Sequence, residues 1–231
     1  LLLGVTGFLY FVRRECWWAA GVCASLITIK PHLLYLFSMA LLFWSINCRR
    51  WGALGGFVLT LIAAMGVVWA INPALIDQYT YALANYPPAQ WATPTFGALL
   101  RVWLGVEKFW LQFVPSTIGA LWFLFYWRTQ HAEWDWTEHT PILMLVSITM
   151  ATYSWTFDHV MFLLAVIQAA ICLIHMRFSW VTGGLWVSYA GLMVIHLFPT
   201  MNQLWYWWMA PCFLVWYLLV RQITIQEAEK C

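Results

Sequence analysis

Long apolar runs, separated by short polar or charged breaks, fill the sequence from end to end. The runs do not alternate apolar and polar residues, so they do not predict the strands of a membrane barrel. They predict helices, which satisfy their own backbone polar groups in lipid. Measured against the roughly 20 residues that cross a bilayer, the pattern predicts about nine hydrophobic segments, some short or broken: 1–12, 16–29, 32–47, 51–72, 109–127, 141–153, 159–175, 181–198 and 204–220.

These segments predict an all-α, polytopic helical membrane protein with a single transmembrane domain over 1–231. The composition agrees, because 64% of the residues are hydrophobic and only 9% are charged, against roughly 25% charged in soluble domains. The formal net charge of +2 comes without a basic tract, so no nucleic-acid partner is predicted. The six cysteines are scattered, without C-x-x-C spacing, so we predict packing thiols, no metal site and no cofactor.

The first apolar run, 1–12, precedes Arg13 and Arg14, whereas a secretory signal peptide carries its basic residues before its apolar core. We therefore expect this run to be part of a transmembrane helix whose protein extends further upstream. Two other patterns concern packing. Many of the nineteen tryptophans lie at segment ends, as in an aromatic belt at the lipid headgroups. Gly52 and Gly56 have the G-x-x-x-G spacing that lets two helices approach closely.

Lys30 occupies the most informative break in the pattern. It lies in Lys30-Pro31-His32, between the runs 16–28 and 33–47, neither of which contains a charge. Pro31 has no N–H and disfavours helical geometry at Lys30, so it ends or kinks the first helix. An ammonium left in hydrocarbon costs several kcal/mol. Lys30 must therefore reach a membrane surface or face a polar cavity.

The longest stretch outside the apolar segments is a loop at about 73–108, with turn signals at 72–73 and 86–88. Thr93-Pro94 predicts a helix start, because Thr is a capping residue and Pro suits the first helical position. The helix that follows, roughly 94–104, is apolar with one arginine, Arg101. It is too short to span, so we expect it to lie in the membrane interface.

The basic residues orient the segments, because cytoplasmic loops collect Lys and Arg. If Arg13 and Arg14 lie inside and the segments alternate, eight of the eleven basic residues fall on the cytoplasmic side. The exceptions are Lys30, Arg101 and Lys108. The loop at 73–108, which includes Asp77 and Glu107, then lies outside, and so do Asp158 and His159. The outer face thus combines few charges, of both signs, with polar helix ends.

Three basic residues near this outer face are candidates for binding an anion. Lys30 can aim a point charge at a phosphate at the membrane edge; alternatively it is a lysine that snorkels from a helix end. His32 can donate to the same anion or simply lie in the interface. Arg101 is the single cation on its apolar helix, and contact with an ordinary lipid headgroup would explain that placement equally well.

The segment 153–159 carries the second group of candidates, directly before an apolar helix. Asp158 can act as a general base or hold a sugar hydroxyl, Trp155 can offer a face for stacking, and His159 stands beside them. The alternative is helix capping, which alone would explain an Asp at a helix N-terminus. An Asp-His pair framed by aromatic residues is more than a cap requires. The sequence contains no nucleotide-binding or soluble-hydrolase motif.

Taken together, these motifs resemble glycosyltransferase family 87, the DUF2029 type, whose members use polyprenyl-phosphate sugars and include bacterial mannosyltransferases. The resemblance begins in 21–51, with Lys30-Pro31 between two apolar helices and Arg49-Arg50-Trp51 before the next. It continues in 95–104, where the family has a short helix with basic residues, and in 153–159, where members show an aromatic-Ser-Trp segment followed by Asp or His. It covers about 10–175.

The resemblance implies a fold of the GT-C class in the bacterial cytoplasmic membrane, with its active site facing outward. It implies transfer of a hexose or pentose, with mannose favoured, from a polyprenyl-phosphate donor to a hydroxyl of a lipid or glycan acceptor. Lys30 and Arg101 would bind the donor phosphate, and the sugar or acceptor would lie near four residues: His32, Trp155, Asp158 and His159. The family's catalytic base is an aspartate in an earlier outer loop, upstream of this chain, so we expect this chain alone to be inactive.

Two other classes of function are consistent with the composition. A transporter would place charges near the middle of its helices and would repeat its topology with broken helices in matching positions. The charges here lie at helix ends, and we find no such repeat. A non-catalytic membrane subunit would leave Lys30 and Asp158 replaceable. A different lipid-linked glycosyltransferase or ligase is closer to family 87 in its chemistry, and these motifs distinguish it poorly from that family.

Overall fold

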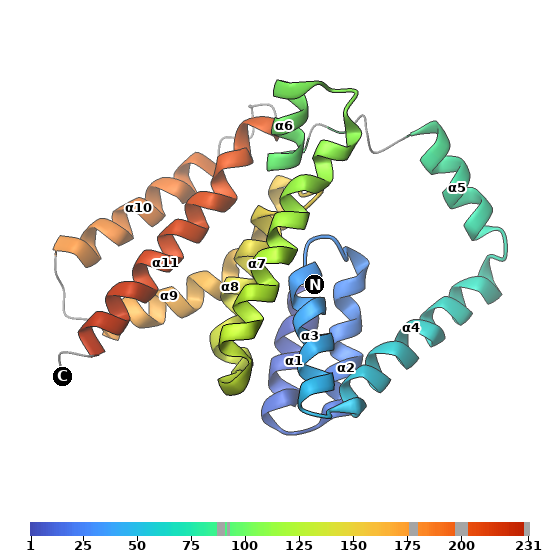
Figure 1. The fold of residues 1–231 in the computed structure, drawn as a ribbon, viewed down its shortest axis with the longest axis horizontal. Coiled ribbons are helices and arrows are strands. Elements are labelled where there is room, and N and C mark those ends of the chain that lie inside the picture. Colours follow the sequence, from blue (N-terminus) through green and yellow to red (C-terminus); the bar gives the residue numbers. More distant parts are fainter. Residues whose placement is uncertain (87–90, 92, 176–179, 197–202, 229–231) are drawn as a thin grey trace.

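The computed structural model describes residues 1–86, 91, 93–175, 180–196 and 203–228, and all the regular structure in them is helical. The side chains of 175, 181, 196, 227 and 228 lie outside this description. Within these residues eleven α-helices follow one another, several of them extended by 3-10 turns (Figure 1). Their bounds are α1 Leu2–Arg13, α2 Trp17–Ser25, α3 Tyr35–Asn47, α4 Trp51–Ile71, α5 Leu75–Asn85, α6 Phe96–Leu104, α7 Val114–Gln130, α8 Trp136–Thr149, α9 Leu163–His175, α10 Trp180–His196 and α11 Met209–Ala228.

In the described part of the chain, four helical stretches are long and apolar enough to cross a membrane. One is α4 itself, and the others combine a helix with its flanking 3-10 turns: Phe109–Glu133, Thr156–Ile174 and Gln203–Gln226. Four shorter apolar helices accompany them, at Leu2–Arg13, Trp17–Ile29, Tyr35–Asn47 and Thr182–Ile195. The all-helical prediction is therefore confirmed, and the chain has the helices of an integral membrane protein. The number of crossings beyond these four stays a prediction.

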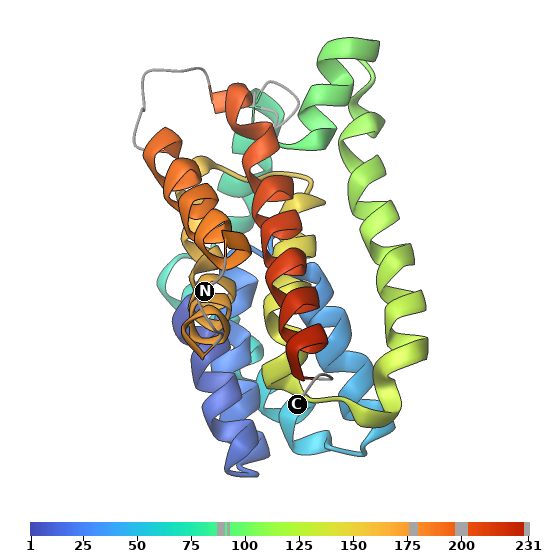
Figure 2. The same cartoon turned by 90° about the vertical axis from the view of Figure 1, so that its left-hand side faces the viewer.

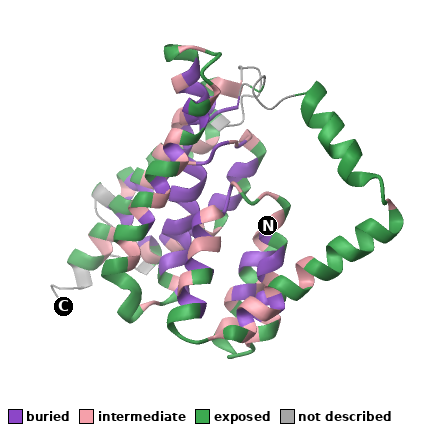
Figure 3. Ribbon diagram, turned by 45° about the vertical axis from the view of Figure 1, so that its right-hand side comes forward, coloured by how far each residue is buried: buried purple, intermediate pink, exposed green. Residues whose placement is uncertain are grey.

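Helix α8 lies at the centre of the molecule. Every residue from His139 to Thr149 is buried, because α3 packs against one side of α8 and α9 and α11 pack against another. Figures 1 and 2 show these helices gathered side by side, and Figure 3 shows burial concentrated among them. A helix that is apolar all round belongs inside a bundle. At the start of α8, Arg13 donates a hydrogen bond to Thr137 (3.2 Å), which joins the end of α1 to this helix.

Helices α2 and α4 meet through glycines. A Cβ placed on Gly56 would lie 2.3 Å from the carbonyl oxygen of Trp18, and one on Gly21 would lie 2.0 Å from that of Ala53. Only a hydrogen atom fits at these positions, so the backbones touch. A Cβ on Gly52 would lie 3.1 Å from the Cβ of Trp17. The close approach predicted from Gly52 and Gly56 is confirmed, with α2 as the partner helix.

The rest of α4 and the whole of α5 extend away from the bundle (Figures 1 and 3). Every residue of α5 is exposed. The sequence analysis expected a single helix in the loop at 73–108 and missed α5. Its apolar residues recur at helical spacing, at Leu75, Ile76, Tyr79 and Leu83, but they stand between two proline-containing turn signals that favour a loop.

Helix α6 begins later than predicted. It starts at Phe96, and its N-cap is Thr95, which has extended backbone angles (φ −127°, ψ 154°) and accepts a hydrogen bond from the Ala98 N–H at 3.3 Å. The prediction that Thr93 caps the helix and Pro94 opens it is wrong. The hydroxyl of Thr93 instead lies 3.3 Å from that of Thr95. Either threonine could cap, and Thr95, whose backbone is extended as a capping residue requires, does so.

Candidate functional site

Lys30 and Asp158 form a salt bridge between two distant parts of the chain. Lys30 follows a 3-10 turn, Leu26–Ile29, that ends the α2 segment, and Asp158 lies in the 3-10 turn Thr156–Phe162 that opens the α9 segment. The Lys30 Nζ lies 2.6 Å from the Asp158 Oδ1. The Asp158 side chain is 5% exposed, whereas that of Lys30 is 29% exposed. The pair thus combines a buried carboxylate with an ammonium that still reaches outside.

The local fold of 155–158 orients the Asp158 carboxylate. Trp155 has extended backbone angles, and its N–H donates to the Asp158 Oδ2 at 2.9 Å. The Asp158 N–H donates back to the Trp155 carbonyl, also at 2.9 Å. One carboxylate oxygen therefore caps the turn while the other binds Lys30. The interpretation of Asp158 as a cap is confirmed for Oδ2, whereas its role as a general base or as a ligand of a sugar hydroxyl stays a prediction.

Aromatic side chains surround this pair, and we call them the aromatic surround: Trp91, Tyr153, Trp155 and Phe157. The Lys30 Nζ lies 4.3 Å from the centre of the Phe157 ring. Phe157 is nearly parallel to Trp155, with ring centres 6.4 Å apart, and Trp91 contacts both Tyr153 (5.6 Å) and Trp155 (6.4 Å). Phe157 is 64% and Trp91 41% exposed, so both rings can be reached from outside.

His32 belongs to the same group. It lies in the turn between Leu26–Ile29 and α3, and its ring meets that of Tyr153 edge to face at 6.1 Å. Burial lowers the pKa of His32; the charge of Asp158 opposes this shift and the charge of Lys30 adds to it. His32 is therefore a neutral ring beside a cation at neutral pH, able to donate one hydrogen bond and accept another.

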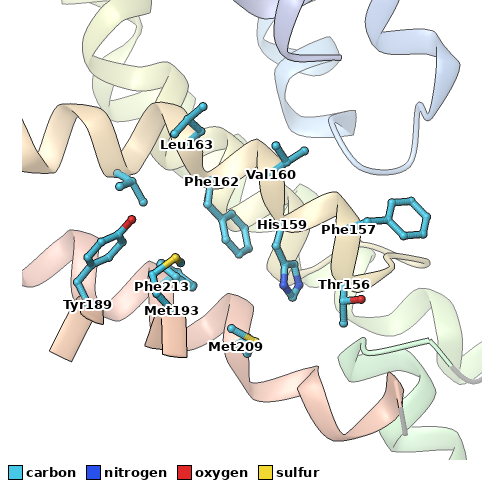
Figure 4. A pocket seen from close by; sticks show the side chains of 11 residues that line it. Thr156, Phe157, His159, Val160, Phe162, Leu163, Tyr189, Met193, Met209 and Phe213 are labelled. Carbon is cyan, nitrogen blue, oxygen red and sulfur yellow. The ribbon is translucent and has the colours of Figure 1, made fainter. Parts of the chain in front are cut away.

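His159 faces a different space. Its side chain is 7% exposed and stacks on Phe162, with ring centres 4.9 Å apart. It lines a cavity of about 280 Å³ between the α9 segment, α10 and α11 (Figure 4). Apart from His159, Thr156 and Tyr189, the lining is apolar: Phe157, Val160, Phe162, Leu163, Val166, Met193, Met209 and Phe213. His159 thus lies beside Asp158 in the chain but is directed into an apolar pocket.

Arg101 is bonded within its own loop. It is 4% exposed, and its Nε and Nη2 donate to the Val106 carbonyl at 3.3 and 2.9 Å. Its Nη1 donates to the Gln112 Oε1 at 3.2 Å. Burial raises the pKa of the Tyr153 hydroxyl, and the nearby charge of Arg101 opposes that shift. Arg101 therefore lies near the aromatic surround, but its guanidinium joins the end of α6 to the turn Phe109–Phe113.

Gln112 links Arg101 to the segment that carries Asp158. It was not among the site residues predicted from the sequence. It is fully buried, and its Nε2 donates to the Thr152 carbonyl (2.5 Å) and to the Thr95 hydroxyl (3.3 Å). Ser116 adds two contacts to the same segment, at 2.8 Å each, to the Met150 carbonyl and the Thr152 hydroxyl. The sequence feature that could have pointed to Gln112 is its position as one amide within the apolar run 109–114.

The structure therefore brings Lys30, His32, Trp155 and Asp158 into one group, with Arg101 joined to it through Gln112 and His159 directed into the adjoining cavity. Within the described part of the chain, no three His, Cys, Asp or Glu side chains are grouped to hold a metal ion. Comparison of the chain with models of protein families, with curated proteins and with solved structures gives no match.

Proposed function

We propose that this chain forms the donor-binding part of a membrane glycosyltransferase with a GT-C-like fold. The enzyme takes a hexose or pentose, with mannose favoured, from a polyprenyl-phosphate donor and attaches it to a hydroxyl of a lipid or glycan acceptor. The reaction takes place at the outward face of the bacterial cytoplasmic membrane. The observation that carries the proposal is the salt bridge between Lys30 and Asp158 inside the aromatic surround.

Lys30 supplies the phosphate contact. An ammonium has three N–H donors, and the bond to Asp158 uses one of them while the side chain remains 29% exposed. The remaining donors suit a phosphate oxygen, because charge-assisted hydrogen bonds to phosphate are short and strong. Asp158 fixes where the ammonium lies, since its own position is set by the Trp155 N–H. Such fixed charge is effective where negative charge develops in a transition state.

The aromatic surround suits the sugar. Phe157 lies beside the ammonium and parallel to Trp155, and the exposed ring of Trp91 contacts Trp155. A hexose has apolar C–H faces and a polar edge, so aromatic rings next to hydrogen-bonding groups match both. His32, a neutral ring that can donate and accept, is placed to meet a sugar hydroxyl. An acceptor or donor group that enters from the cavity would meet His159.

In the proposed reaction the acceptor hydroxyl oxygen attacks the sugar C1. The bond from C1 to the phosphate oxygen breaks, and its electron pair stays on the phosphate, where Lys30 neutralises it. The acceptor proton passes to a general base. We do not assign that base to Asp158, because one of its oxygens holds Lys30 and the other accepts the Trp155 N–H. Asp158 positions the ammonium instead.

The position of the pair favours an enzyme over a transporter. Asp158 is the third residue of the Thr156–Ile174 stretch, and Lys30 directly follows the Trp17–Ile29 helix. Both charges therefore lie at the ends of apolar helices, whereas ions that mark a permeation path lie deep within them. A charge pair at the membrane edge suits a lipid phosphate, which is anchored at the same depth.

The test is transfer of labelled mannose from polyprenyl phosphate, in membranes that contain the full-length protein. Lys30→Met is expected to lower transfer by about 100-fold or more, the usual effect of removing one such stabilising donor. Lys108→Met is the matched control, because Lys108 is an exposed lysine of the outer loop, and it should transfer normally. Parental rates in well-inserted Lys30→Met would refute the phosphate role. No transfer by the parent from any sugar donor would favour a transporter or a non-catalytic subunit.

A further inference from the structure

A second cavity, of about 260 Å³ and with charged and polar side chains in its wall, lies at the other end of the bundle. Glu138 of α8, Gln168 and Cys172 of α9, and Tyr217 and Arg221 of α11 contribute to its wall, with Ala169, Val220, Thr224 and Ile225 completing it. Glu138 stands at the start of α8, whereas the segment that carries Asp158 follows the end of α8. A helix of 14 residues is about 21 Å long, so this cavity is remote from Lys30.

Two opposite charges line this cavity without pairing. Glu138 is exposed and Arg221 is partly exposed. Among the side chains that the structure describes, neither forms a salt bridge with the other or with a third residue. A cation and an anion that face one small cavity and remain apart leave room for a ligand that carries both charges. Such a ligand would satisfy both of them.

The wall around these charges is held in place by hydrogen bonds. The Tyr217 hydroxyl donates to the Gln168 Oε1 at 2.5 Å, and the Gln168 Nε2 donates to the Thr137 carbonyl at 3.5 Å. Nearby, the Tyr126 hydroxyl and the His139 Nδ1 are 2.7 Å apart. The Arg221 guanidinium forms a side-chain hydrogen bond with Tyr126, which leaves its other N–H groups for a ligand, and its charge also lies close to Tyr217 and His139. A wall ordered in this way gives a charged ligand a preorganised site.

We propose that this cavity binds the phosphoethanolamine headgroup of a membrane lipid. The Arg221 guanidinium takes the phosphate, because its planar fork matches phosphate oxygens. The Glu138 carboxylate takes the primary amine. Glu138 disfavours a purely anionic headgroup, and a choline headgroup has no N–H to donate to it. This site is independent of the proposed transferase site.

The size and surroundings of the cavity agree with a lipid as the source of the headgroup. Ligand pockets usually measure about 300–1,000 Å³, so this cavity holds a headgroup and leaves the acyl chains outside. Exposed apolar side chains of α11 provide a surface for those chains: Ile225, which belongs to the cavity wall, and Leu218, which follows Tyr217 of that wall. The helices that form the cavity include two of the candidate membrane spans.

Native mass spectrometry of the purified full-length protein, titrated with defined lipids, tests the proposal. The parent should bind phosphatidylethanolamine about tenfold or more better than phosphatidylcholine or phosphatidylglycerol, the effect of one charge-assisted contact. Arg221→Gln should lower binding of phosphatidylethanolamine by a similar factor. Glu138→Gln should remove the preference over phosphatidylcholine and, because Glu138 is exposed, should leave the fold intact. The matched controls are Arg128→Gln and Glu133→Gln, which remove exposed charges outside the cavity wall.

Three results would overturn the proposal. The first is equal binding of the three lipids by the parent. The second is a loss in either control as large as that in its matched variant. The third is a preference for phosphatidylethanolamine that persists in Glu138→Gln. Soluble glycerophosphoethanolamine separates the sources of the headgroup: weak competition supports a lipid held also by its chains, whereas binding as tight as that of the lipid would overturn the lipid assignment.

Discussion

The Lys30 ammonium and the Asp158 carboxylate meet at 2.6 Å, although 128 residues separate them in the sequence. The contact joins the turn before α3 to the turn that opens the α9 segment, so it fixes two helices relative to each other at one end of the bundle. The buried partner is Asp158, and the partly exposed one is Lys30. Removal of Lys30 therefore leaves a buried carboxylate without its partner, whereas removal of Asp158 leaves an ammonium that is partly exposed.

This inequality predicts the outcome of a double-mutant cycle. Lys30→Met leaves an uncompensated carboxylate at 5% exposure. Removing one partner of a fully buried pair costs about 3–5 kcal/mol, and the partial exposure of Lys30 reduces the expected loss to about 2–3 kcal/mol. Asp158→Asn should cost only about 1 kcal/mol, because Lys30 can turn to water. Thermal unfolding in detergent measures both losses.

The double variant, Lys30→Met with Asp158→Asn, should be more stable than Lys30→Met alone, because no buried charge remains. A coupling of about 1–2 kcal/mol is expected between residues in direct contact. Losses that simply add would show that the two side chains do not interact in the folded protein. At roughly 2–4 °C in Tm per kcal/mol for a chain of this size, the difference is readily measured.

The close packing of α2 on α4 predicts that a methyl group added at Gly56 will destabilise the protein by steric overlap. Gly56→Ala places a methyl group 2.3 Å from the Trp18 carbonyl oxygen, a backbone atom that cannot move aside cheaply. We expect a loss of about 1–3 kcal/mol, as for other overpacked sites, measured by the Tm. Gly66→Ala on the same helix is the control, because nothing lies within 4 Å of its added Cβ. In a helix that change should be neutral or stabilising. Equal losses at both sites would contradict the close contact.

The sequence predicted the helices better than their contacts. The apolar runs located the helices that are long enough to cross a membrane, because a run of that length leaves no other stable structure in lipid. It missed α5, because Asn72-Pro73 and Pro87-Pro88 favour turns on both sides of a short amphipathic pattern. It also assigned the wrong cap to α6. Thr93 and Thr95 are both capping residues, and the backbone angles that choose between them are not visible in the sequence.

For the candidate site, the sequence selected residues but not their partners. Charge bias put Lys30 and Asp158 on one side of the membrane, and the structure places them in contact. The burial of Arg101 could not be predicted, because it depends on Gln112 and on the Val106 carbonyl at the far end of a turn. His159 was grouped with Asp158 as its neighbour in the chain. Which way each side chain points was decided by the 3-10 turn, which the sequence did not reveal.

Gln112 makes a prediction about the order of the segment 150–158. It is the buried amide that joins Arg101 to the Thr152 carbonyl. Gln112→Met keeps the volume but leaves both partners unsatisfied, which costs about 1–3 kcal/mol. Faster hydrogen exchange is expected in the segment 150–158, while α2 and α4 stay protected. The matched control is Gln222→Met, at an exposed position of α11. Unchanged exchange in 150–158 would show that the amide does not hold this segment.

His32 makes a prediction about pH. Burial lowers its pKa below its ordinary value of about 6.5, with Asp158 opposing and Lys30 adding to the shift. As the pH falls below about 6.5, the His32 ring binds a proton in the unfolded chain but not yet in the folded chain. The free energy of unfolding should therefore fall. The slope is at most about 1.4 kcal/mol per pH unit for one proton, and it vanishes once the pH falls below the native pKa. Thermal unfolding between about pH 7 and pH 5 measures the effect.

The variant His32→Gln should flatten this dependence, because it keeps a neutral side chain that can donate and accept hydrogen bonds but removes the titrating ring. Its stability near pH 7 should stay close to that of the parent, since His32 is already neutral there. The matched control is His131→Gln, which changes an exposed histidine at the end of α7 and should leave the slope unchanged. If His32→Gln loses stability on acidification as steeply as the parent, another group carries the pH dependence. The partly buried position of His32 beside Lys30 would then have no measurable effect on its titration.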